Sequence, residues 1–213
     1  MENPPHAAIY VNNTLIPPAT IEQISIPYTD ILAVSLAAHP SFRKPILSVN
    51  LYNDPRNHSA TKELRAILLH HIKIDNYDGI LIGEDFNLYH SLWNPAGYTA
   101  QDADAETLVE TMMEANLRPL LPLGTITRIP PQHNSSQLPT AIDLIWSNKN
   151  AEDILVNCHT VEETKDHRSD HYPIEITLDL SPKKLPPTQP PYDYNNTNWD
   201  LVQIERQCIL PPP

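Results

Sequence analysis

The sequence has few cysteines and no long apolar runs, which excludes several classes of protein. Its two cysteines, Cys158 and Cys208, form no Cys-x-x-Cys pair, whereas disulfide-stapled secreted domains and structural zinc sites use more cysteines at closer spacing. No apolar stretch approaches the roughly 20 residues that span a bilayer. The first residues lack the basic start and apolar core of a signal peptide. We therefore expect no membrane partner and an intracellular location, nuclear or cytoplasmic.

Basic residues are also scarce. The chain has 14 Lys and Arg residues against 26 Asp and Glu residues, a formal net charge of −12. Neutralisation of phosphates by basic side chains dominates non-specific binding to nucleic acid, so this charge disfavours tight autonomous binding of DNA. It does not exclude phosphodiester chemistry, because a divalent cation can offset the carboxylates of a nuclease and clamp the phosphate.

Proline is abundant, with 23 residues among 213, whereas glycine is limited to 4. The length suffices for one domain with a sizeable core. From about Ser181 the chain becomes proline-rich and polar, which is typical of a linker. We predict one domain at residues 1–180 and a proline-rich linker or tail at residues 181–213.

Hydrophobic periodicity predicts that strands and helices interleave in this domain. Alternating or continuous apolar runs predict strands at residues 7–11, 31–38, 46–52, 80–82, 141–146, 154–156 and 174–178. Helical spacing predicts helices at residues 59–72, with Ser59 as N-cap, and at residues 103–116. Short and irregular connections between the strands favour a mixed-sheet α/β sandwich over a doubly wound fold.

Acidic, amide and imidazole side chains gather in three short segments at predicted strand ends. In the first, Gly83-Glu84-Asp85-Phe86-Asn87, the side chains of Asp85 and Asn87 face the same way in an extended chain. Together they can hold a water molecule and a phosphate oxygen. Asp and Asn are equally typical of a turn that ends a strand, so the segment alone leaves both interpretations open.

The second and third segments carry Asp143 and the pair Asp170-His171. Asp143 lies in an apolar run, and a buried carboxylate is costly unless it is paired. It therefore faces a cleft or is satisfied by backbone amides or an arginine. A histidine oriented by a carboxylate suits acid-base chemistry near neutral pH, whereas a polar loop is the alternative for Asp170-His171. The spacing of His167 and His171 is a weak signal for zinc.

The order of the three segments is more specific than any one of them. The succession Gly-x-Asp-Phe-Asn, Ile-Asp-Leu-Ile and Ser-Asp-His-x-Pro-Ile resembles the endonuclease/exonuclease/phosphatase superfamily. The longer match at residues 83–94 resembles its non-LTR retrotransposon branch, as do the strand end at residues 50–55 and the tail at residues 192–200. The resemblance covers roughly residues 7–200.

The resemblance implies a deoxyribonuclease-like fold, a two-sheet β-sandwich flanked by helices. It implies hydrolysis of DNA phosphodiester bonds with Mg²⁺ or Mn²⁺. DNA is then the substrate, and a reverse transcriptase domain is the expected partner within a parent polyprotein.

The resemblance also implies roles for individual residues. Asp85 would activate the attacking water, Asn87 would help to hold it, and Asp143 would orient His171. His171 and Tyr52 would contact the scissile phosphate. Further implied residues are the metal ligands Asp170 and Asp85, and the nucleic-acid contacts Asn53, His90 and Trp93.

The chain also departs from the pattern of the family. The family's domain normally opens with a strand that carries an Asn, followed by a helix and a strand with the Glu that is the chief metal ligand. We expect this chain to begin after both, and Glu84 stands where a small residue often sits. Three interpretations stay open: an active metal-dependent endonuclease, an inactive remnant of one, and a non-enzymatic binding module. The residues after Asp-Phe-Asn argue against a phosphatase or sphingomyelinase.

Overall fold

In the computed structural model, which describes residues 6–37, 42–130, 137–166 and 168–180, a mixed sheet has the strand order β1-β2-β3-β4-β6-β5. Its strands are β1 (Ile21–Ile24), β2 (Ile31–Leu36), β3 (Ile46–Leu51), β4 (Gly79–Asp85), β5 (Arg118–Pro119) and β6 (Asp143–Ser147). The tail predicted from residue 181 onward, and His167, lie outside the described residues. The residues that are described all belong to one compact unit, Met1–Pro182.

The pairing of the strands brings the ends of β3 and β4 together. These two strands run parallel, whereas the other neighbours in the sheet are antiparallel. Parallel neighbours finish at the same edge of a sheet, and the backbone N–H of Asn53, just after β3, donates to the carbonyl oxygen of Asp85 at 2.8 Å. Side chains more than thirty positions apart in the sequence therefore meet at this edge.

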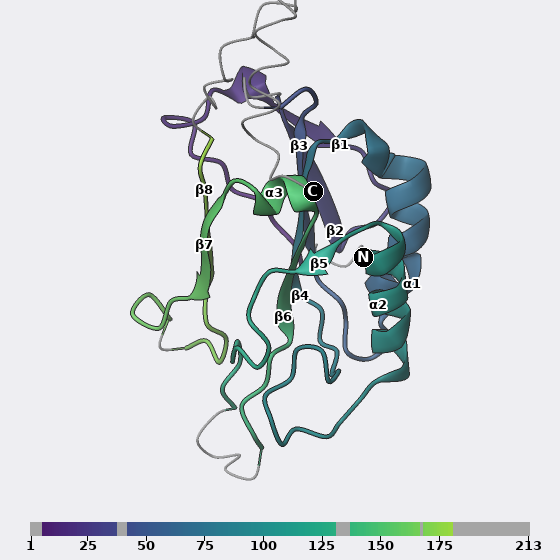
Figure 1. Ribbon diagram of the computed structural model, residues 1–213, viewed down its shortest axis with the longest axis vertical. Coiled ribbons are helices and arrows are strands. Elements are labelled where there is room, and N and C mark those ends of the chain that lie inside the picture. The colour runs from purple at the N-terminus through teal and green to yellow at the C-terminus, as the bar shows by residue number, and fades with distance from the viewer. Residues whose placement is uncertain (1–5, 38–41, 131–136, 167, 181–213) are drawn as a thin grey trace, which may run out of the picture. The chain divides into compact units, whose positions relative to one another are not determined.

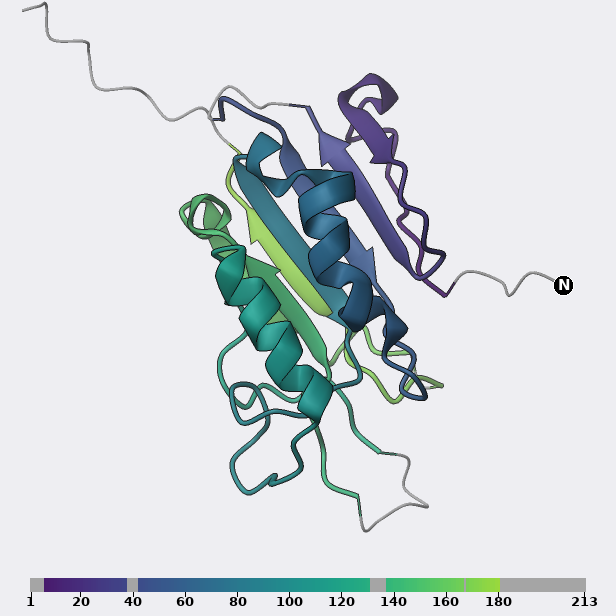
Figure 2. The ribbon, with the colours of Figure 1, turned by 90° about the vertical axis from the view of Figure 1, so that its right-hand side faces the viewer.

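Two helices cover one face of the six-stranded sheet. They are α1 (Ser59–Ala66), which continues as a π-helical segment (Ile67–Ile72), and α2 (Ala103–Glu114). Figure 2 shows α1 and α2 side by side in front of the sheet, and they contact each other. Their apolar stripes pack on alternate strand residues, and the core includes the fully buried side chains of Leu47, Leu64, Ile82, Leu108 and Trp146.

A second, two-stranded antiparallel sheet lies on the other side of the six-stranded sheet from the helices (Figure 1). Its strands are β7 (Leu155–Thr160) and β8 (Ile174–Leu178). The two sheets and the flanking helices confirm the predicted fold class, an α/β sandwich of the deoxyribonuclease-like kind. No helix among the described residues is both long enough and apolar enough to cross a membrane.

Two local expectations differ from the structure, and two short elements were not expected. Residues 7–11 form no strand, and the carbonyl oxygen of Ala8 accepts instead from the side chain of Asn50. β1 was missed because it has no buried residue and so no apolar alternation. Ser59 is not the N-cap of α1: His58 holds that position with φ 52°, and Ser59 is the first helical residue. The short helix α3 (Lys149–Glu152) is capped by Asn148, whose side chain accepts from Ala151.

Candidate functional site at the sheet edge

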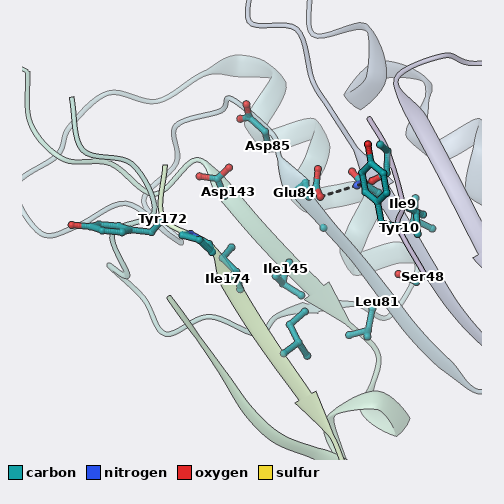
Figure 3. A pocket seen from close by; sticks show the side chains of 16 residues that line it. Ile9, Tyr10, Ser48, Leu81, Glu84, Asp85, Asp143, Ile145, Tyr172 and Ile174 are labelled. Carbon is teal, nitrogen blue, oxygen red and sulfur yellow. Dashed lines mark hydrogen bonds between the residues drawn. The ribbon is translucent and has the colours of Figure 1, made fainter. Parts of the chain in front are cut away.

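A cavity of about 600 Å³ opens between the uncovered face of the six-stranded sheet and β8. Its floor is apolar, with Leu81 and Ile145 from the large sheet and Ile174 from β8. At one end of it lie the carboxylates of Glu84, Asp85 and Asp143 (Figure 3). The cavity therefore combines an apolar wall with a concentration of negative charge.

Asp143 and His171 form a hydrogen-bonded pair at this end. Nδ1 of His171 lies 3.0 Å and 2.9 Å from the two carboxylate oxygens of Asp143. Because both oxygens are acceptors, Nδ1 carries the hydrogen and donates it, which leaves Nε2 as the nitrogen available for other partners. The Asp143 hydrogen bond raises the pKa of His171 although burial of the ring opposes this. The pair thus favours a protonated imidazole.

Asp85 lies directly across the sheet from Asp143, as its partner in the register of β4 and β6. Burial and, next, the neighbouring charge of Asp143 raise the pKa of Asp85 to about 6. Asn87, with a left-handed φ of 49°, donates its backbone N–H to Oδ1 of Asp85 at 3.2 Å. A carboxylate whose pKa is close to neutral can exchange a proton with water at physiological pH.

The donor set at this end fits a hard divalent cation. Asp85, Asp143 and His171 each offer one ligand atom, and these atoms all lie within 4.8 Å of one another. Since Nδ1 of His171 is already bonded to Asp143, the carboxylate oxygens are the natural ligands, and oxygen is what Mg²⁺ and Mn²⁺ prefer. Burial and then the charge of Asp143 raise the pKa of Asp85, and a bound cation would stabilise its ionised form.

Asp170 is held by an arginine rather than by this cluster. Nε of Arg128 donates to Oδ2 of Asp170 at 2.8 Å, while the other carboxylate oxygen lies 3.7 Å from Nε2 of His171. Burial raises the pKa of Asp170, but the hydrogen bond and charge of Arg128 outweigh it and lower the value. Asp170 is thus ionised beside His171, and its predicted role as a metal ligand stays a prediction.

Tyr52 and Asn53 follow β3 at the same edge. Burial and then the negative charge of Asp85 raise the pKa of Tyr52, so its hydroxyl stays protonated and can donate a hydrogen bond. The side chain of Asn53 is fully buried, donates to the carbonyl oxygen of Phe86 at 2.7 Å and accepts from the N–H of Thr61 at 3.2 Å. Asn53 therefore ties the strand ends to α1, and its predicted contact with nucleic acid stays untested.

His90 and Trp93 are buried within the loop that follows β4. The N–H of Leu92 donates to Nδ1 of His90 at 3.1 Å, so the ring hydrogen is on Nε2, which faces Glu106 at 3.0 Å. Trp93 donates to the carbonyl oxygen of Leu88 at 2.9 Å and packs edge-on against Trp146. In this structure both residues stabilise the loop, and their predicted contact with nucleic acid stays a prediction.

Thr127 is a site residue that the sequence did not reveal. Its fully buried hydroxyl oxygen accepts the backbone N–H groups of Ile142 and Asp143, both at 3.0 Å. Its carbonyl oxygen accepts from Tyr172 N–H at 2.7 Å. Thr127 thus joins the backbone beside Asp143 to the backbone beside His171. It precedes Arg128, which forms two isolated bridges, in a segment without periodicity, so no sequence signal identifies it.

Comparisons with known proteins agree with this fold. A family model described as endonuclease-reverse transcriptase matches residues 46–175. The fold is similar to the endonuclease domain of TRAS1, a telomere-specific non-LTR retrotransposon, with a TM-score of 0.60 and 17% identity over 76% of this chain and 70% of that one. No curated protein sequence matches the chain.

Two further structures share the fold. One is the 3′ phosphatase NExo from Neisseria, bound to a product DNA hairpin, with a TM-score of 0.54 and 12% identity over 75% of this chain and 70% of that one. The other is the AP endonuclease LMAP from Leishmania major, with a TM-score of 0.51 and 16% identity over 71% of this chain and 55% of that one. At these identities the similarity concerns the fold.

Proposed function

Since the chain belongs to the endonuclease-reverse transcriptase family, we propose that its cavity hydrolyses phosphodiester bonds of DNA with the help of a divalent cation. The observation that carries the proposal is the Asp143–His171 hydrogen-bonded pair facing Asp85 across the strand ends. An ion pair that only stabilises the fold does not require a further carboxylate with a raised pKa beside it. A hydrolytic site needs both a proton acceptor and a group that stabilises negative charge.

In the proposed reaction Asp85 is the general base. A water molecule hydrogen-bonded to Asp85 and Asn87 forms the new bond to phosphorus, and its proton passes to the Asp85 carboxylate. The bond between phosphorus and one sugar oxygen then breaks, and this oxygen takes up a proton from solvent water as it leaves. The pKa of about 6 leaves most of Asp85 ionised at neutral pH while keeping it basic enough to accept the proton.

His171 and Tyr52 are the proposed contacts to the phosphate. The protonated His171, oriented by Asp143, donates from Nε2 to a phosphate oxygen and stabilises the charge that develops there. Tyr52 donates from its hydroxyl. A bound divalent cation would neutralise phosphate charge and stabilise the leaving oxygen. Asp85 and Asp143 would hold it, with Asp170 as a further ligand kept ionised by Arg128.

The biological setting is part of the same proposal. The family description and the similarity to the TRAS1 endonuclease support an origin in a non-LTR retrotransposon. The expected partner is then a reverse transcriptase domain of the same polyprotein, for which this domain opens one strand of DNA.

The test is nicking of supercoiled plasmid by the purified chain with Mg²⁺ or Mn²⁺. We expect the wild type to nick the plasmid, EDTA to abolish nicking, and His171→Ala to reduce the rate by roughly 10²–10⁴-fold, the usual contribution of a group acting in the transition state. Circular dichroism shows whether the variant remains folded.

Exposed His159 on β7 supplies a matched control, since it is a histidine of the neighbouring two-stranded sheet, outside the cluster of Asp85, Asp143 and His171. His159→Ala should nick like the wild type. Nicking that survives His171→Ala, or that does not need metal, would contradict the proposal. A folded wild type that binds DNA and does not nick it would identify an inactive remnant.

A further inference from the structure

Arg128 lies directly beside His171 in the fold. The backbones of the two residues form an antiparallel bridge, and the hydrogen bonds of this bridge, at 2.7 Å and 2.8 Å, are made by the residues on either side of them. They are therefore a narrow pair, whose Cα atoms lie about 4.5 Å apart and whose side chains share one face. The guanidinium of Arg128 thus emerges next to the imidazole that the proposed reaction uses.

Two neighbours fix the direction of the Arg128 side chain. On one side its Nε donates to Oδ2 of Asp170 at 2.8 Å. On another side lies Tyr98, whose ring stacks on Tyr89 with 5.1 Å between the centroids. Burial and then Tyr89 raise the pKa of Tyr98 to about 12, and the positive charge of Arg128 lies close enough to oppose this shift. The guanidinium is therefore held in place before any ligand binds.

The hydrogen bond to Asp170 occupies only part of the guanidinium. Among the described residues the terminal nitrogens of Arg128 have no hydrogen-bond partner, and neither is among the polar atoms that are buried without one. The side chain is 25% exposed, so these donors are open to a ligand from solvent. A planar guanidinium with open terminal donors is suited to bind two oxygens of one phosphate.

The charges around the site explain why DNA needs a cation here. The chain has a net charge of −12, and the carboxylates of Asp85, Asp143 and Asp170 surround the imidazole. Oδ1 of Asp170 lies 3.7 Å from Nε2 of His171 while Oδ2 accepts from Arg128, so one carboxylate separates the imidazole from the guanidinium. A phosphate on Nε2 leaves the guanidinium to the next phosphate, because phosphates follow one another along a DNA strand at short, regular intervals.

We propose that Arg128 binds a phosphate of the DNA strand, the one next to the scissile phosphate, through the terminal nitrogens of its guanidinium. The proposal rests on the proposed function, because it requires that the scissile phosphate lies on Nε2 of His171. Asp170 and Tyr98 are then positioning residues, which hold the guanidinium beside the imidazole. An arginine that only paired with Asp170 would affect the stability of the fold and leave the salt dependence of DNA binding unchanged.

The test measures binding of a short fluorescein-labelled DNA duplex by the full chain, as fluorescence anisotropy in EDTA at a series of salt concentrations. Arg128→Gln removes the charge and keeps an amide that can donate to Asp170. We expect it to weaken binding by about tenfold or more. The slope of the logarithm of affinity against the logarithm of salt concentration should become shallower by about 0.9, the value for one phosphate contact.

Arg118→Gln is the matched control, since Arg118 is exposed on β5 and the change in net charge is the same. It should bind the duplex within about twofold of the wild-type affinity and with the wild-type slope, as expected for a distant screened charge.

Arg128→Lys is a second variant that keeps the proposal testable if Arg128→Gln folds poorly. Lysine retains the charge but not the planar fork, so this variant should bind several-fold more weakly than the wild type with the wild-type slope. Wild-type affinity and slope in Arg128→Gln, an equal loss in Arg118→Gln, or a shallower slope in Arg128→Lys overturns the proposal. A wild type that does not bind the duplex overturns it as well. In each of these cases the proposed function stands if the wild type nicks plasmid with Mg²⁺ and His171→Ala does not.

Discussion

The two faces of the six-stranded sheet are built from the same strands and serve opposite purposes. On the helix-covered face, Leu47, Ile82 and Trp146 are fully buried among other apolar side chains. On the other face, one position away on the same strands, Ser48, Gly83 and Ile145 border an open cavity that ends in three carboxylates. Alternation along a strand therefore separates the apolar core from the proposed active-site cavity by a single position.

The two faces of the sheet also differ in how they contribute to the stability of the fold. Burial of apolar side chains on the helix-covered face supplies the driving force for folding. On the cavity face, burial and, next, the charge of Asp143 raise the pKa of Asp85, so in the absence of a cation its ionised form works against the folded state. A change on one face should thus be felt mainly as stability, and a change on the other mainly as activity.

Leu108→Ala should have the largest effect on stability. Leu108 is fully buried between α2 and the sheet, and truncation of such a side chain costs about 2–5 kcal/mol of the free energy of unfolding. Urea denaturation measures this loss. Met113→Ala, on the exposed side of the same helix, is the control. Both variants should nick at the same rate per folded molecule. A lower rate for folded Leu108→Ala would contradict the idea that the helix-covered face affects stability alone.

Thr127→Val should lower both stability and nicking activity, because Thr127 links the two segments that carry Asp143 and His171. Valine keeps the shape but leaves two buried N–H groups without an acceptor, which costs about 1–3 kcal/mol. Nicking should also fall, since the backbone beside Asp143 loses its anchor. Thr127→Ser retains the hydroxyl and should restore both stability and activity, and equal damage by serine would show that the methyl group matters instead.

Asp85→Asn should raise stability while it removes activity. The pKa of Asp85 is raised from 3.8 to about 6, so the stabilising contribution of its protonated form is present below pH 3.8 and is lost as the pH rises through about 6. Asparagine avoids that loss. In EDTA at about pH 8 the variant should be more stable by on the order of 2 kcal/mol, and at about pH 3.5 by nearly nothing.

Asp54→Asn is the control for that titration, because its effect on the free energy of unfolding should have the opposite sign. A hydrogen bond from Arg56 lowers the pKa of Asp54 to about 2. Its stabilising contribution is therefore present above pH 3.8 and is lost as the pH falls through about 2. Asp54→Asn should destabilise the protein at neutral pH, as measured by urea denaturation. A gain in stability for both variants would point to a general effect of net charge.

The sequence predicted the helix-covered face better than the cavity face. Apolar periodicity identified the strands at residues 46–52 and 80–82 and the helix at residues 103–116, because each side chain that points into a core must be apolar. It also identified Asp143 as a carboxylate in need of a partner. Periodicity did not identify His171 as that partner, because the two residues are 28 positions apart and only the fold brings them together.

What the sequence missed depends on tertiary contacts. Thr127 looks like an ordinary loop residue until Thr140 and Tyr172 are placed beside it. The conformation of Glu84 is invisible, since nothing in Gly-Glu-Asp-Phe-Asn indicates a positive φ at the glutamate. His90 and Trp93 were predicted to contact nucleic acid from a motif, whereas their burial follows from the way the loop folds back on Leu88.

The connection through Thr127 and Arg128 has a consequence for the order in which the molecule assembles. Arg128 is bridged both to Thr140 and to His171, so this segment joins two parts of the chain that must both be in place first. Contacts between distant positions form late, because the entropy of loop closure must be overcome before they are rewarded. During refolding, the ability to cleave, which needs this junction, should therefore not return before the fluorescence of the buried Trp146 in β6 has recovered.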